Sequence, residues 1–552
     1  MLTQAGADRL RDALRQVVAG MGFPDAELVL ERPRDAGHGD FATNVALKLA
    51  ARLKQPPRRV AQTILDRVAL PADVVTKVEI AGPGFINFWL ASSALADVLP
   101  RILGAGRAFG CSTAGAGRRV NVEFVSANPT GPLHVGHGRQ AALGDAIARL
   151  LECTGWQVAR EFYYNDAGTQ IANLARSVQA RIQQLRGLDV LIPEGGYHGE
   201  YIRDIAERYV AQHPSDPDGA DGEAVRRFAV QELRAEQDRD LQAVGIRFDV
   251  YYLESSLYTS GKVEEAVRRL VAAGHTYEKD GALWLRTTDF GDDKDRVMRK
   301  RAEKGGEFTY FLPDVAYHLT KWERGFTRAI NIHGADHHGT VRRVRIGLQA
   351  LGMEIPEGYP EYVLHQMVTV MRRGEEVKIS KRAGNYVTLR DLVDEVGGDA
   401  VRYFFLMRKS DSHFVFDIDL AATQTEENPV YYVQYAHTRM AGIFRTAGAD
   451  PASVRADGVD LSVLSEPDEQ ELLKHLAEFP AVVSLAGELL EPHRIVAYLD
   501  QLARLTNGWY HRHRVIGADP ELERARLVLV RAAQIVLARG LELLGVSAPE
   551  RM

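Results

Sequence analysis

The feature that most constrains the fold is a strand, a turn, a helix and a second strand in immediate succession. VNVEFVS (120–126) alternates apolar and polar residues as a β-strand does, and a turn-forming segment, NPTGPLHVG (128–136), follows. Residues 137–155 then have a helical pattern that Gly155 is placed to end, and WQVAREFYY (156–164) predicts a strand. Such a βαβ unit requires a parallel sheet and is typical of nucleotide-binding folds.

The same alternation returns later in the chain. A strand is predicted at 327–334, a helix at 341–352 and a strand at 361–371. Residues from about 175 to 260 are helical and strongly charged, and we interpret them as an insertion between two halves of one sheet. Residues 113–424 are therefore predicted to form one Rossmann-type α/β domain.

Two further domains are predicted on either side. Residues 1–112 combine helical patterns at 8–20 and 42–54 with a strand-like run at 74–90, which indicates a small α+β domain. The Gly-, Ala- and Ser-rich stretch at 104–119 is a candidate linker. Residues 425–552 lack strand patterns and contain long amphipathic helices, which is typical of a helical bundle.

The bulk properties are those of a multi-domain cytoplasmic protein. A chain of 552 residues exceeds what one core holds, and its net charge of −6 argues against a non-specific binder of polyanions. No apolar run reaches the ~18 residues that would span a bilayer, so we expect no membrane association. Cys111 and Cys153 are far apart in the chain, which predicts no disulfide framework and no zinc site, and fits a reducing compartment.

Two short motifs are candidates for chemistry. His134-Val135-Gly136-His137 lies where the first strand of the sheet gives way to a helix. A helix N-terminus attracts phosphate, imidazoles can donate to phosphate oxygens, and Gly136 allows an adenine ring close to the backbone. Two histidines that cap a helix without a ligand would show the same pattern.

The second motif is KISKR, residues 378–382, placed just after a strand. A basic loop of this kind can close on a triphosphate and stabilise a pyrophosphate leaving group. A solvated basic loop is the simpler interpretation of such a cluster when it stands alone. The two motifs together favour the nucleotide interpretation, because each follows a strand of the same predicted sheet.

The pair HVGH and KISKR resembles the signature motifs of class I aminoacyl-tRNA synthetases, and the surrounding sequence is similar to the arginine-specific family. FYYNDAG (162–168), GALWLRTTDFGDDKDRVMRK (281–300) and TYFLPDVAYH (309–318) resemble further blocks of that family. GDFATNVALKLA (39–50) resembles its additional N-terminal domain, and LLGVSAPERM (543–552) resembles its C-terminus. The resemblance covers nearly the whole chain.

The resemblance implies an arginine site. A guanidinium is planar, always charged and best held by paired carboxylates. Glu123, Tyr310 and Asp314 would form the guanidinium pocket, and Ser126 and Asn128 would hold the α-amino and carboxylate end, near His134. A further polar group is expected from GADHHG (334–339), where Asp336 stands near a position that is glutamine in many relatives.

The resemblance also implies the reaction. Arginine and ATP give arginyl-adenylate and pyrophosphate, and the 2′-hydroxyl of the terminal adenosine of tRNA(Arg) then takes the arginine. His134 and His137 would stabilise charge on the phosphates, and Lys378 and Lys381 would neutralise the pyrophosphate. Mg²⁺ is expected with the ATP, bound mainly through phosphate oxygens. The residues expected to bind ATP are His134, Gly136, His137, Lys378, Ser380, Lys381 and Arg382.

For the tRNA, the resemblance places the D-loop on the N-terminal domain and the anticodon on the C-terminal helices. Phe85 and Asn87 match positions that read a D-loop base in some relatives. Tyr431, Trp509 and Tyr510 are candidate contacts in the helical domain, although a core position is the more common role for any one of them. The family also favours a monomer.

Two alternatives stay open on the sequence alone. The first is a related HxGH enzyme, such as another amino-acid ligase or a nucleotidyltransferase. The second is a synthetase-like protein without catalytic activity that binds RNA or regulates a partner. Both motifs are intact in this chain, which argues against the second alternative.

Overall fold

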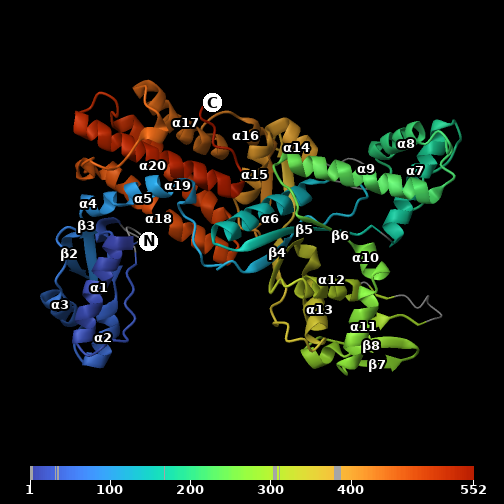
Figure 1. Cartoon of the computed structure of the whole chain (residues 1–552), viewed down its shortest axis with the longest axis horizontal. Helices are drawn as coiled ribbons and strands as arrows, with labels where there is room; N and C mark the ends of the chain where they lie inside the picture. The colour runs from blue at the N-terminus through green and yellow to red at the C-terminus, as the bar shows by residue number, and fades with distance from the viewer. Residues whose placement is uncertain are drawn as a thin grey trace.

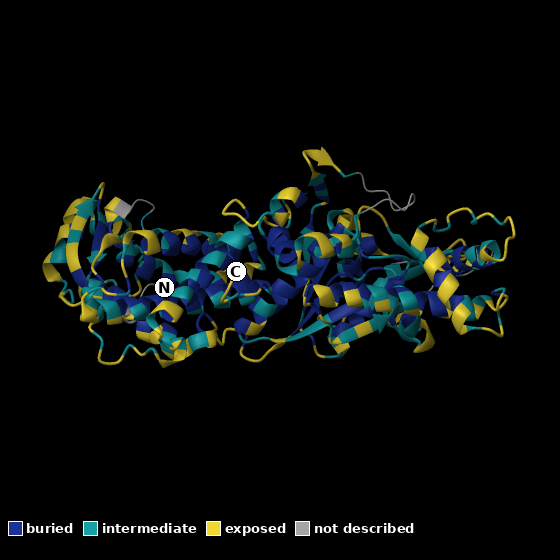
Figure 2. Cartoon of the chain, turned by 90° about the horizontal axis from the view of Figure 1, so that it is seen from above, coloured by how far each residue is buried: buried dark blue, intermediate teal, exposed yellow. Residues whose placement is uncertain are grey.

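The computed structural model describes residues 4–31, 33, 36–166, 168–301, 308–309, 311–377 and 387–552. Figure 1 shows an elongated molecule in which the N-terminal residues form a lobe at one end, beneath the C-terminal helices, and a group of inserted helices projects at the other end. Figure 2 shows the buried residues along its length, and one cluster of them is continuous from the N-terminal lobe into the C-terminal helices. No helix in the described ranges is long and apolar enough to cross a membrane.

The N-terminal lobe packs helices against a three-stranded antiparallel sheet of order β1-β3-β2. The helices predicted at 8–20 and 42–54 are confirmed, and the strand-like run at 74–90 forms a hairpin that turns at residues 82–84. Its elements are α1 (Gln4–Gly20), β1 (Phe41–Thr43), α2 (Val45–Leu53), α3 (Pro57–Arg67), β2 (Val75–Ala81) and β3 (Phe85–Leu90), followed by α4 (Ser92–Ala96) and α5 (Val98–Ala105).

The central sheet has five parallel strands in the order β11-β10-β4-β5-β6, as the βαβ patterns predict. The chain leaves β4 towards β5 and β6 on one side, and returns to β10 and β11 on the other. Ligands of such sheets bind at the carboxyl ends of the strands where the order reverses, here between β4 and β10. The elements are β4 (Arg119–Glu123), α6 (Val135–Cys153), β5 (Gln157–Tyr164), β6 (Val250–Leu253), β10 (Arg328–Gly334), α13 (His338–Gln349) and β11 (Glu361–His365).

The inserted segment differs from the single insertion predicted at 175–260. Residues 250–253 form β6, the edge strand of the sheet, so the chain returns to the sheet between two insertions. A strand of four residues is too short to give a clear alternation in the sequence. The insertions comprise α7 (Gly168–Leu185), α8 (Glu200–Gln212) and α9 (Gly222–Ala243), then α10 (Glu254–Thr259), α11 (Lys262–Ala272), β7 (Thr276–Lys279), β8 (Ala282–Leu285), β9 (Arg296–Arg299) and α12 (Phe311–Glu323).

After β11 the chain forms a small sheet and then a helical bundle. The strand predicted at 361–371 is two strands, because the chain leaves the main sheet after β11 and pairs instead with β13 and β14. The bundle is confirmed in the C-terminal part. The elements are β12 (Val368–Arg372), β13 (Glu375–Glu376), α14 (Leu389–Val396), α15 (Gly398–Leu406), β14 (Phe414–Asp417), α16 (Ile418–Ala422), α17 (Pro429–Ala447), α18 (Pro467–Leu489), α19 (His493–Arg512) and α20 (Pro520–Leu544).

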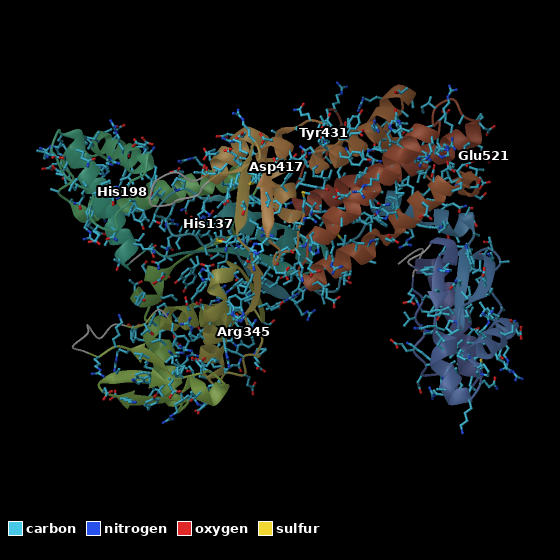
Figure 3. All side chains as sticks on the ribbon, turned by 180° about the vertical axis from the view of Figure 1, so that it is seen from behind. His137, His198, Arg345, Asp417, Tyr431 and Glu521 are labelled. Atoms are coloured by element: carbon cyan, nitrogen blue, oxygen red, sulfur yellow. A yellow bond between two sulfur atoms is a disulfide. The ribbon has the colours of Figure 1, made fainter. Side chains whose placement is uncertain are left out.

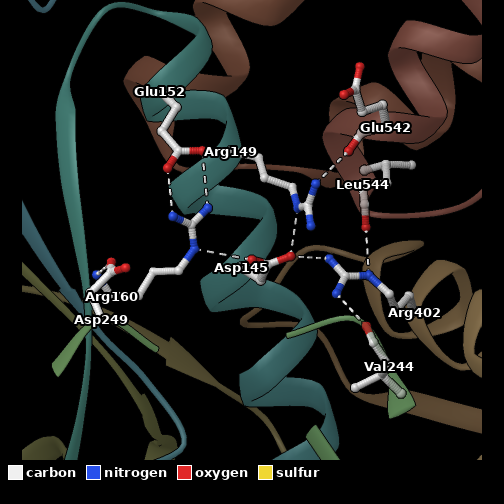
Figure 4. A network of polar contacts seen from close by, with 9 residues as sticks. All are labelled: Asp145, Arg149, Glu152, Arg160, Val244, Asp249, Arg402, Glu542 and Leu544. Carbon is white, nitrogen blue, oxygen red and sulfur yellow. Dashed lines mark hydrogen bonds and ion pairs between the residues drawn. The ribbon is translucent and has the colours of Figure 1, made fainter. Parts of the chain in front are cut away.

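A buried polar network joins α6 to the C-terminal helices (Figure 4). Arg402, on α15, donates to the carboxylate of Asp145 on α6 and to the carbonyl oxygens of Val244 and Leu544, each at 2.9 Å. Burial by itself would raise the pKa of Asp145, but the surrounding guanidinium charges lower it to about 2. The arginines around this carboxylate are Arg149, Arg160 and Arg402. Three segments distant in the sequence are thus fixed to α6.

The two cysteines contradict the expectation drawn from their spacing. Cys111 and Cys153 form a disulfide, with Cα atoms 4.7 Å apart. The segment after Cys111 folds back along the end of α6, where the N–H of Ser112 donates to the carbonyl of Cys153 at 2.8 Å. The separation of the two cysteines along the chain therefore did not predict their distance in the fold. Because the cysteines are paired, they no longer support the expectation of a reducing compartment.

Candidate active site

The backbone turns sharply where β4 ends at Glu123. Val125 and Ser126 have φ of 68° and 42°, a left-handed conformation that residues other than glycine rarely adopt. The strand predicted at 120–126 is shorter than expected because its last residues form this turn. The turn brings Ser126 back to Glu123, and Ser126 Oγ donates to Glu123 Oε1 at 2.9 Å. Strain of this kind is typical of sites shaped around a ligand.

His134 is the N-cap of α6. Its Nδ1 accepts from the N–H of Gly136 at 3.0 Å and from that of His137 at 3.4 Å, while His137 Nδ1 accepts from the N–H of His134 at 3.3 Å. The two rings are stacked with centroids 3.7 Å apart. A neutral imidazole that accepts at Nδ1 carries its proton on Nε2, so the backbone sets both rings as Nε2 donors.

Gly136 is required by the position of this ring. A Cβ at residue 136 would lie 2.9 Å from Cε1 of His134, closer than real side chains allow. The absence of a side chain therefore lets His134 fold over the first turn of α6. Close approach of an adenine ring at the same place stays a prediction.

A cavity of about 1680 Å³ opens at the carboxyl ends of the sheet strands. Small-molecule sites usually measure roughly 300–1,000 Å³, so this one has room for an amino acid and a nucleotide together. Figure 3 shows His137 between His198, which lies on the connection between α7 and α8, and Arg345, which lies on α13. The cavity brings together Glu123, Ser126, Asn128, His134, Gly136, His137, Asp314 and Asp336 of the predicted residues.

Glu123 is buried and ion-paired. Lys321, fully buried on α12, donates from Nζ to Glu123 Oε2 at 2.5 Å and to Asn331 Oδ1 at 3.0 Å. Burial by itself would raise the pKa of Glu123, but the charge of Lys321 lowers it to about 2. Glu123 is therefore ionised at neutral pH, at the base of the cavity.

Asp314 faces the same cavity from the first turn of α12 and has a different environment. Burial, followed by the negative charges of Glu254 and Glu123, raises the pKa of Asp314 to about 7. Burial also raises the pKa of Glu254, which begins α10. The charge of Arg343 offsets these effects on Asp314 only in part, and neither Asp314 nor Glu254 forms an ion pair with a described residue. A bound cation would therefore be stabilised at this end of the cavity.

The histidines of the cavity add no positive charge there at neutral pH. Burial lowers the pKa of His318 to about 3 and the pKa values of His333 and His365 to about 4. His318 is held by neighbours on both edges of the ring: Nδ1 contacts the carbonyl of Asp314 at 2.7 Å, and Nε2 contacts Asn331 Nδ2 at 2.5 Å. The acidic end of the cavity therefore keeps its net negative charge.

Several predicted residues lie outside the described ones, namely Tyr310, Lys378, Ser380, Lys381 and Arg382. The chain on either side of KISKR is described. Before it, the N–H of Val377 donates to the carbonyl of Val370 at 2.9 Å, and after it, the N–H of Leu389 donates to the carbonyl of Leu133 at 2.8 Å. Thr388 also forms an isolated β-bridge with His134. Thr388 and Leu389, where the described chain resumes after KISKR, therefore lie directly beside HVGH.

Asn128 and Asp336 lie on different walls of the cavity. Asn128 Nδ2 donates to Gln170 Oε1 on α7 at 2.7 Å. The side chain of Asp336 is 83% exposed and comes within 3.9 Å of His337. Both line the cavity.

The residues predicted to contact tRNA fall into two groups. Tyr431 is half-buried and Tyr510 is 39% exposed, and both lie on the C-terminal helices. Phe85 is half-buried at the start of β3. Asn87 and Trp509 are 3% and 0% exposed, so neither reaches a tRNA base in this conformation, because Asn87 faces the lobe interior and Trp509 fills the bundle core.

The sequence reasoning missed the residues that complete the acidic end of the cavity. Glu254 directly follows β6, as Glu123 ends β4, and an acidic residue at the end of a predicted strand would have been its signal. Lys321, Asn331 and His318 lie in unremarkable sequence, and no local pattern marks them.

Comparisons with known proteins agree with this geometry. The family models for "Arginyl tRNA synthetase N terminal domain", "tRNA synthetases class I (R), catalytic domain" and "DALR anticodon binding domain" match residues 7–90, 99–415 and 433–552. The chain is 58% identical to an arginine–tRNA ligase of Geotalea daltonii, covering 96% of this chain and 95% of that protein. It is 56% identical to that of Bordetella avium, covering 98% of each.

Solved structures agree with the sequence relatives. A putative arginyl-tRNA synthetase from Campylobacter jejuni is 32% identical with a TM-score of 0.77, over 84% of this chain and all of that one. The arginyl-tRNA synthetase of Thermus thermophilus, 24% identical with a TM-score of 0.74 over the whole of both chains, shares the fold. The chain belongs to the class I arginyl-tRNA synthetase family.

Proposed function

We propose that this chain is an arginine–tRNA ligase whose amino-acid site is the acidic end of the cavity. The observation that carries this assignment is the pair Asp314 and Glu254, two buried carboxylates without an ion-pair partner among the described residues, beside the ionised Glu123. A guanidinium supplies the missing charge and donates to several oxygens in one plane. Tyr310 is proposed as a fourth member of the pocket on the resemblance alone.

The other end of arginine is proposed to lie towards HVGH. Ser126 and Asn128, on the turn after β4, and His134 line the cavity between the carboxylates and the start of α6. They offer a hydroxyl, an amide and an imidazole for the α-amino and carboxylate groups. Asp336, on the opposite wall, is a candidate partner for the α-ammonium group.

ATP is proposed to lie over the N-terminus of α6. The carboxylate oxygen of arginine attacks the α-phosphorus of ATP, and the bond from that phosphorus to the α,β-bridging oxygen breaks. Arginyl-adenylate forms, and the β- and γ-phosphates leave as pyrophosphate. The backbone of α6 and Nε2 of His134 and His137 donate to phosphate oxygens as their charge grows. Mg²⁺ bound through the phosphates would neutralise part of that charge. The residues proposed around the triphosphate are His134, Gly136, His137, Lys378, Ser380, Lys381 and Arg382.

The tRNA is proposed to bind along the C-terminal helices and the N-terminal lobe. Tyr431 stacks on Tyr435, and the guanidinium of Arg439 lies 4.3 Å from the ring centre of Tyr435 and 5.4 Å from that of Tyr510. Such a row of aromatic faces and one cation suits unpaired anticodon bases. Phe85 is kept as a candidate for the D-loop. Bound tRNA then delivers the 2′-hydroxyl of its terminal adenosine to the adenylate.

The proposed domain division places the N-terminal domain at 1–112, the catalytic domain at 113–424 and the anticodon-binding domain at 425–552. The three matched family models fall inside these ranges, apart from the first residues of the catalytic match. We also propose that the enzyme acts as a monomer in the cytoplasm, where its tRNA and ATP are found.

The decisive experiment is charging of total tRNA with each of the twenty amino acids, alongside arginine-dependent ATP–pyrophosphate exchange with and without tRNA. We expect charging with arginine alone, and exchange that depends on added tRNA. Charging with another amino acid would contradict the proposed guanidinium pocket, but the assignment of a class I aminoacylation reaction would stand. Folded protein that binds tRNA but neither charges nor exchanges would indicate a non-catalytic relative.

A further inference from the structure

Lys321 is a buried cation at the base of the proposed arginine site. Its side chain is 0% exposed, and its Nζ donates to Glu123 and Asn331 and lies 4.5 Å from the ring centre of Tyr317. A buried ammonium group is costly unless its N–H groups are satisfied, and these contacts satisfy it. Lys321 is therefore a fixed part of the site.

The contacts of Lys321 continue to the backbone of Asp314, the second acidic residue of the site. Asn331 accepts from Lys321 at Oδ1 and donates from Nδ2 to His318 Nε2. The proton of His318 is therefore on Nδ1, which donates to the backbone carbonyl of Asp314. Asp314, His318 and Lys321 follow one another at helical spacing along α12, so they share one face of that helix. Asn331 on β10 is also in register with Glu123 on β4, so the two residues that contact Lys321 are neighbours in the sheet.

The ion pair of Lys321 with Glu123 also determines which carboxylates of the site are available to a positively charged substrate. Buried carboxylates that lie close together do not all ionise unless a cation compensates them. Because Lys321 compensates Glu123, a substrate cation meets Asp314 and Glu254 as the uncompensated charges. The titratable groups that face Lys321 or its partners are Glu123, Glu254, Asp314, Tyr317, His318, His333 and Tyr362.

We propose that Lys321 is a positioning residue for arginine, which orients Glu123 directly and the Asp314 turn of α12 through Asn331 and His318. This inference rests on the proposed arginine site and adds a residue that need not touch the substrate. Removing Lys321 leaves the guanidinium partners in the chain but frees their orientation and changes their charge. The effect should therefore fall on arginine and spare ATP.

The test uses the full-length enzyme in ATP–pyrophosphate exchange at saturating tRNA. The variants are Lys321→Met, Glu123→Gln, the double variant, and Lys474→Met as a control. Lys474, on α18, is a half-buried lysine with a side chain that is 14% exposed, and it is ion-paired at 2.6 Å with the buried carboxylate of Asp40 in the N-terminal lobe. Arginine KM, ATP KM, kcat and the thermal midpoint are measured for each variant.

We expect Lys321→Met to raise the arginine KM roughly 10- to 100-fold, as loss of a charged hydrogen bond does, while the ATP KM stays within about threefold. Glu123→Gln should do the same, and the double variant should be no worse than the more impaired single variant, because both changes break one unit. Lys474→Met should lower the thermal midpoint without changing the arginine KM. If Lys321→Met does not fold, Asn331→Ala cuts the same connection and should raise the arginine KM by a smaller factor.

Two results would overturn the inference, and they are distinguishable. If Glu123→Gln raises the arginine KM but Lys321→Met and Asn331→Ala change only the thermal midpoint, Lys321 has a structural role and the proposed site stands. If Glu123→Gln leaves the arginine KM unchanged, the assignment of Glu123 in the proposed function is wrong, and the role of Lys321 fails with it.

Discussion

Arg402 on α15 and Asp145 on α6 form an ion pair in which the two side chains are 2% and 3% exposed. We predict that Arg402→Met lowers the free energy of unfolding by about 3–5 kcal/mol, because it removes the one fully buried arginine of the three that pair with Asp145 and leaves two backbone carbonyls without their donor. The thermal midpoint measures this. Arg107→Met, which removes an ion pair with Glu542 from a side chain that is 83% exposed, should cost at most about 1 kcal/mol.

The same pair gives a pH dependence. Since the pKa of Asp145 is lowered from 3.8 to about 2, the stabilisation is present above pH 3.8 and is lost as the pH falls towards 2. Equal midpoints for Arg402→Met and Arg107→Met at neutral pH would contradict the importance of the buried pair.

Arginine binding should strengthen as the pH rises through about 7, because Asp314 must lose its proton to pair with the guanidinium. We predict that Asp314→Asn raises the arginine KM roughly 10- to 100-fold and flattens this pH dependence. The measurement is the arginine KM of pyrophosphate exchange across the neutral range. Asp280→Asn, an exposed carboxylate on the turn between β7 and β8, is the matched control and should keep the wild-type profile.

The pKa of Asp314 also predicts the stability of the empty enzyme. A group whose pKa is raised from 3.8 to about 7 stabilises the fold below pH 3.8, and that contribution is lost as the pH rises through 7. Added arginine should restore the thermal midpoint at pH 8 in the wild type and much less in Asp314→Asn. A wild-type midpoint that is insensitive to arginine would contradict the proposed site.

His134 combines a structural and a chemical role that substitution can separate. Asparagine is among the best N-cap residues, so His134→Asn should keep the thermal midpoint while it removes the Nε2 donor. We predict a loss of roughly 10²–10³ in kcat of pyrophosphate exchange. His134→Ala should lose both the helix cap and the Nε2 donor, so the same fall in kcat should be accompanied by a loss of about 1 kcal/mol in the free energy of unfolding. Near-normal kcat in His134→Asn would mean that the ring is only a helix cap.

The parts of the site that could be predicted from the sequence are those in which local pattern and position coincide. HVGH was found because a strand and a helix flank it, and the structure places it at the start of α6 as predicted. The Lys321–Glu123 pair could not be found in this way, because its partners lie 198 residues apart and meet only when β10 enters the sheet beside β4. Trp509 has aromatic and basic neighbours that made it a candidate tRNA contact as well as a core residue, and its full burial supports the core interpretation.

Tyr510 is predicted to contribute to tRNA binding and not to arginine activation. It is 39% exposed and shares Arg439 with Tyr435, so its ring face can stack on an unpaired base. Since such stacking contributes about 1–3 kcal/mol per base, Tyr510→Ala should raise the KM for tRNA roughly 5- to 150-fold without changing the arginine KM. Leu485→Ala, a comparably exposed side chain on α18 at 42%, is the control and should change neither KM.

Trp509, the residue next to Tyr510, is predicted to contribute to stability and not to tRNA binding, and Trp509→Leu tests this. Its ring is fully buried, so the substitution leaves a cavity and should lower the free energy of unfolding by roughly 2–4 kcal/mol. The KM for tRNA, measured well below the midpoint of unfolding, should stay at the wild-type value because the ring has no exposed face. A large rise in that KM with an unchanged thermal midpoint would mean that the C-terminal helices rearrange on binding, so that Trp509 reaches the tRNA after all.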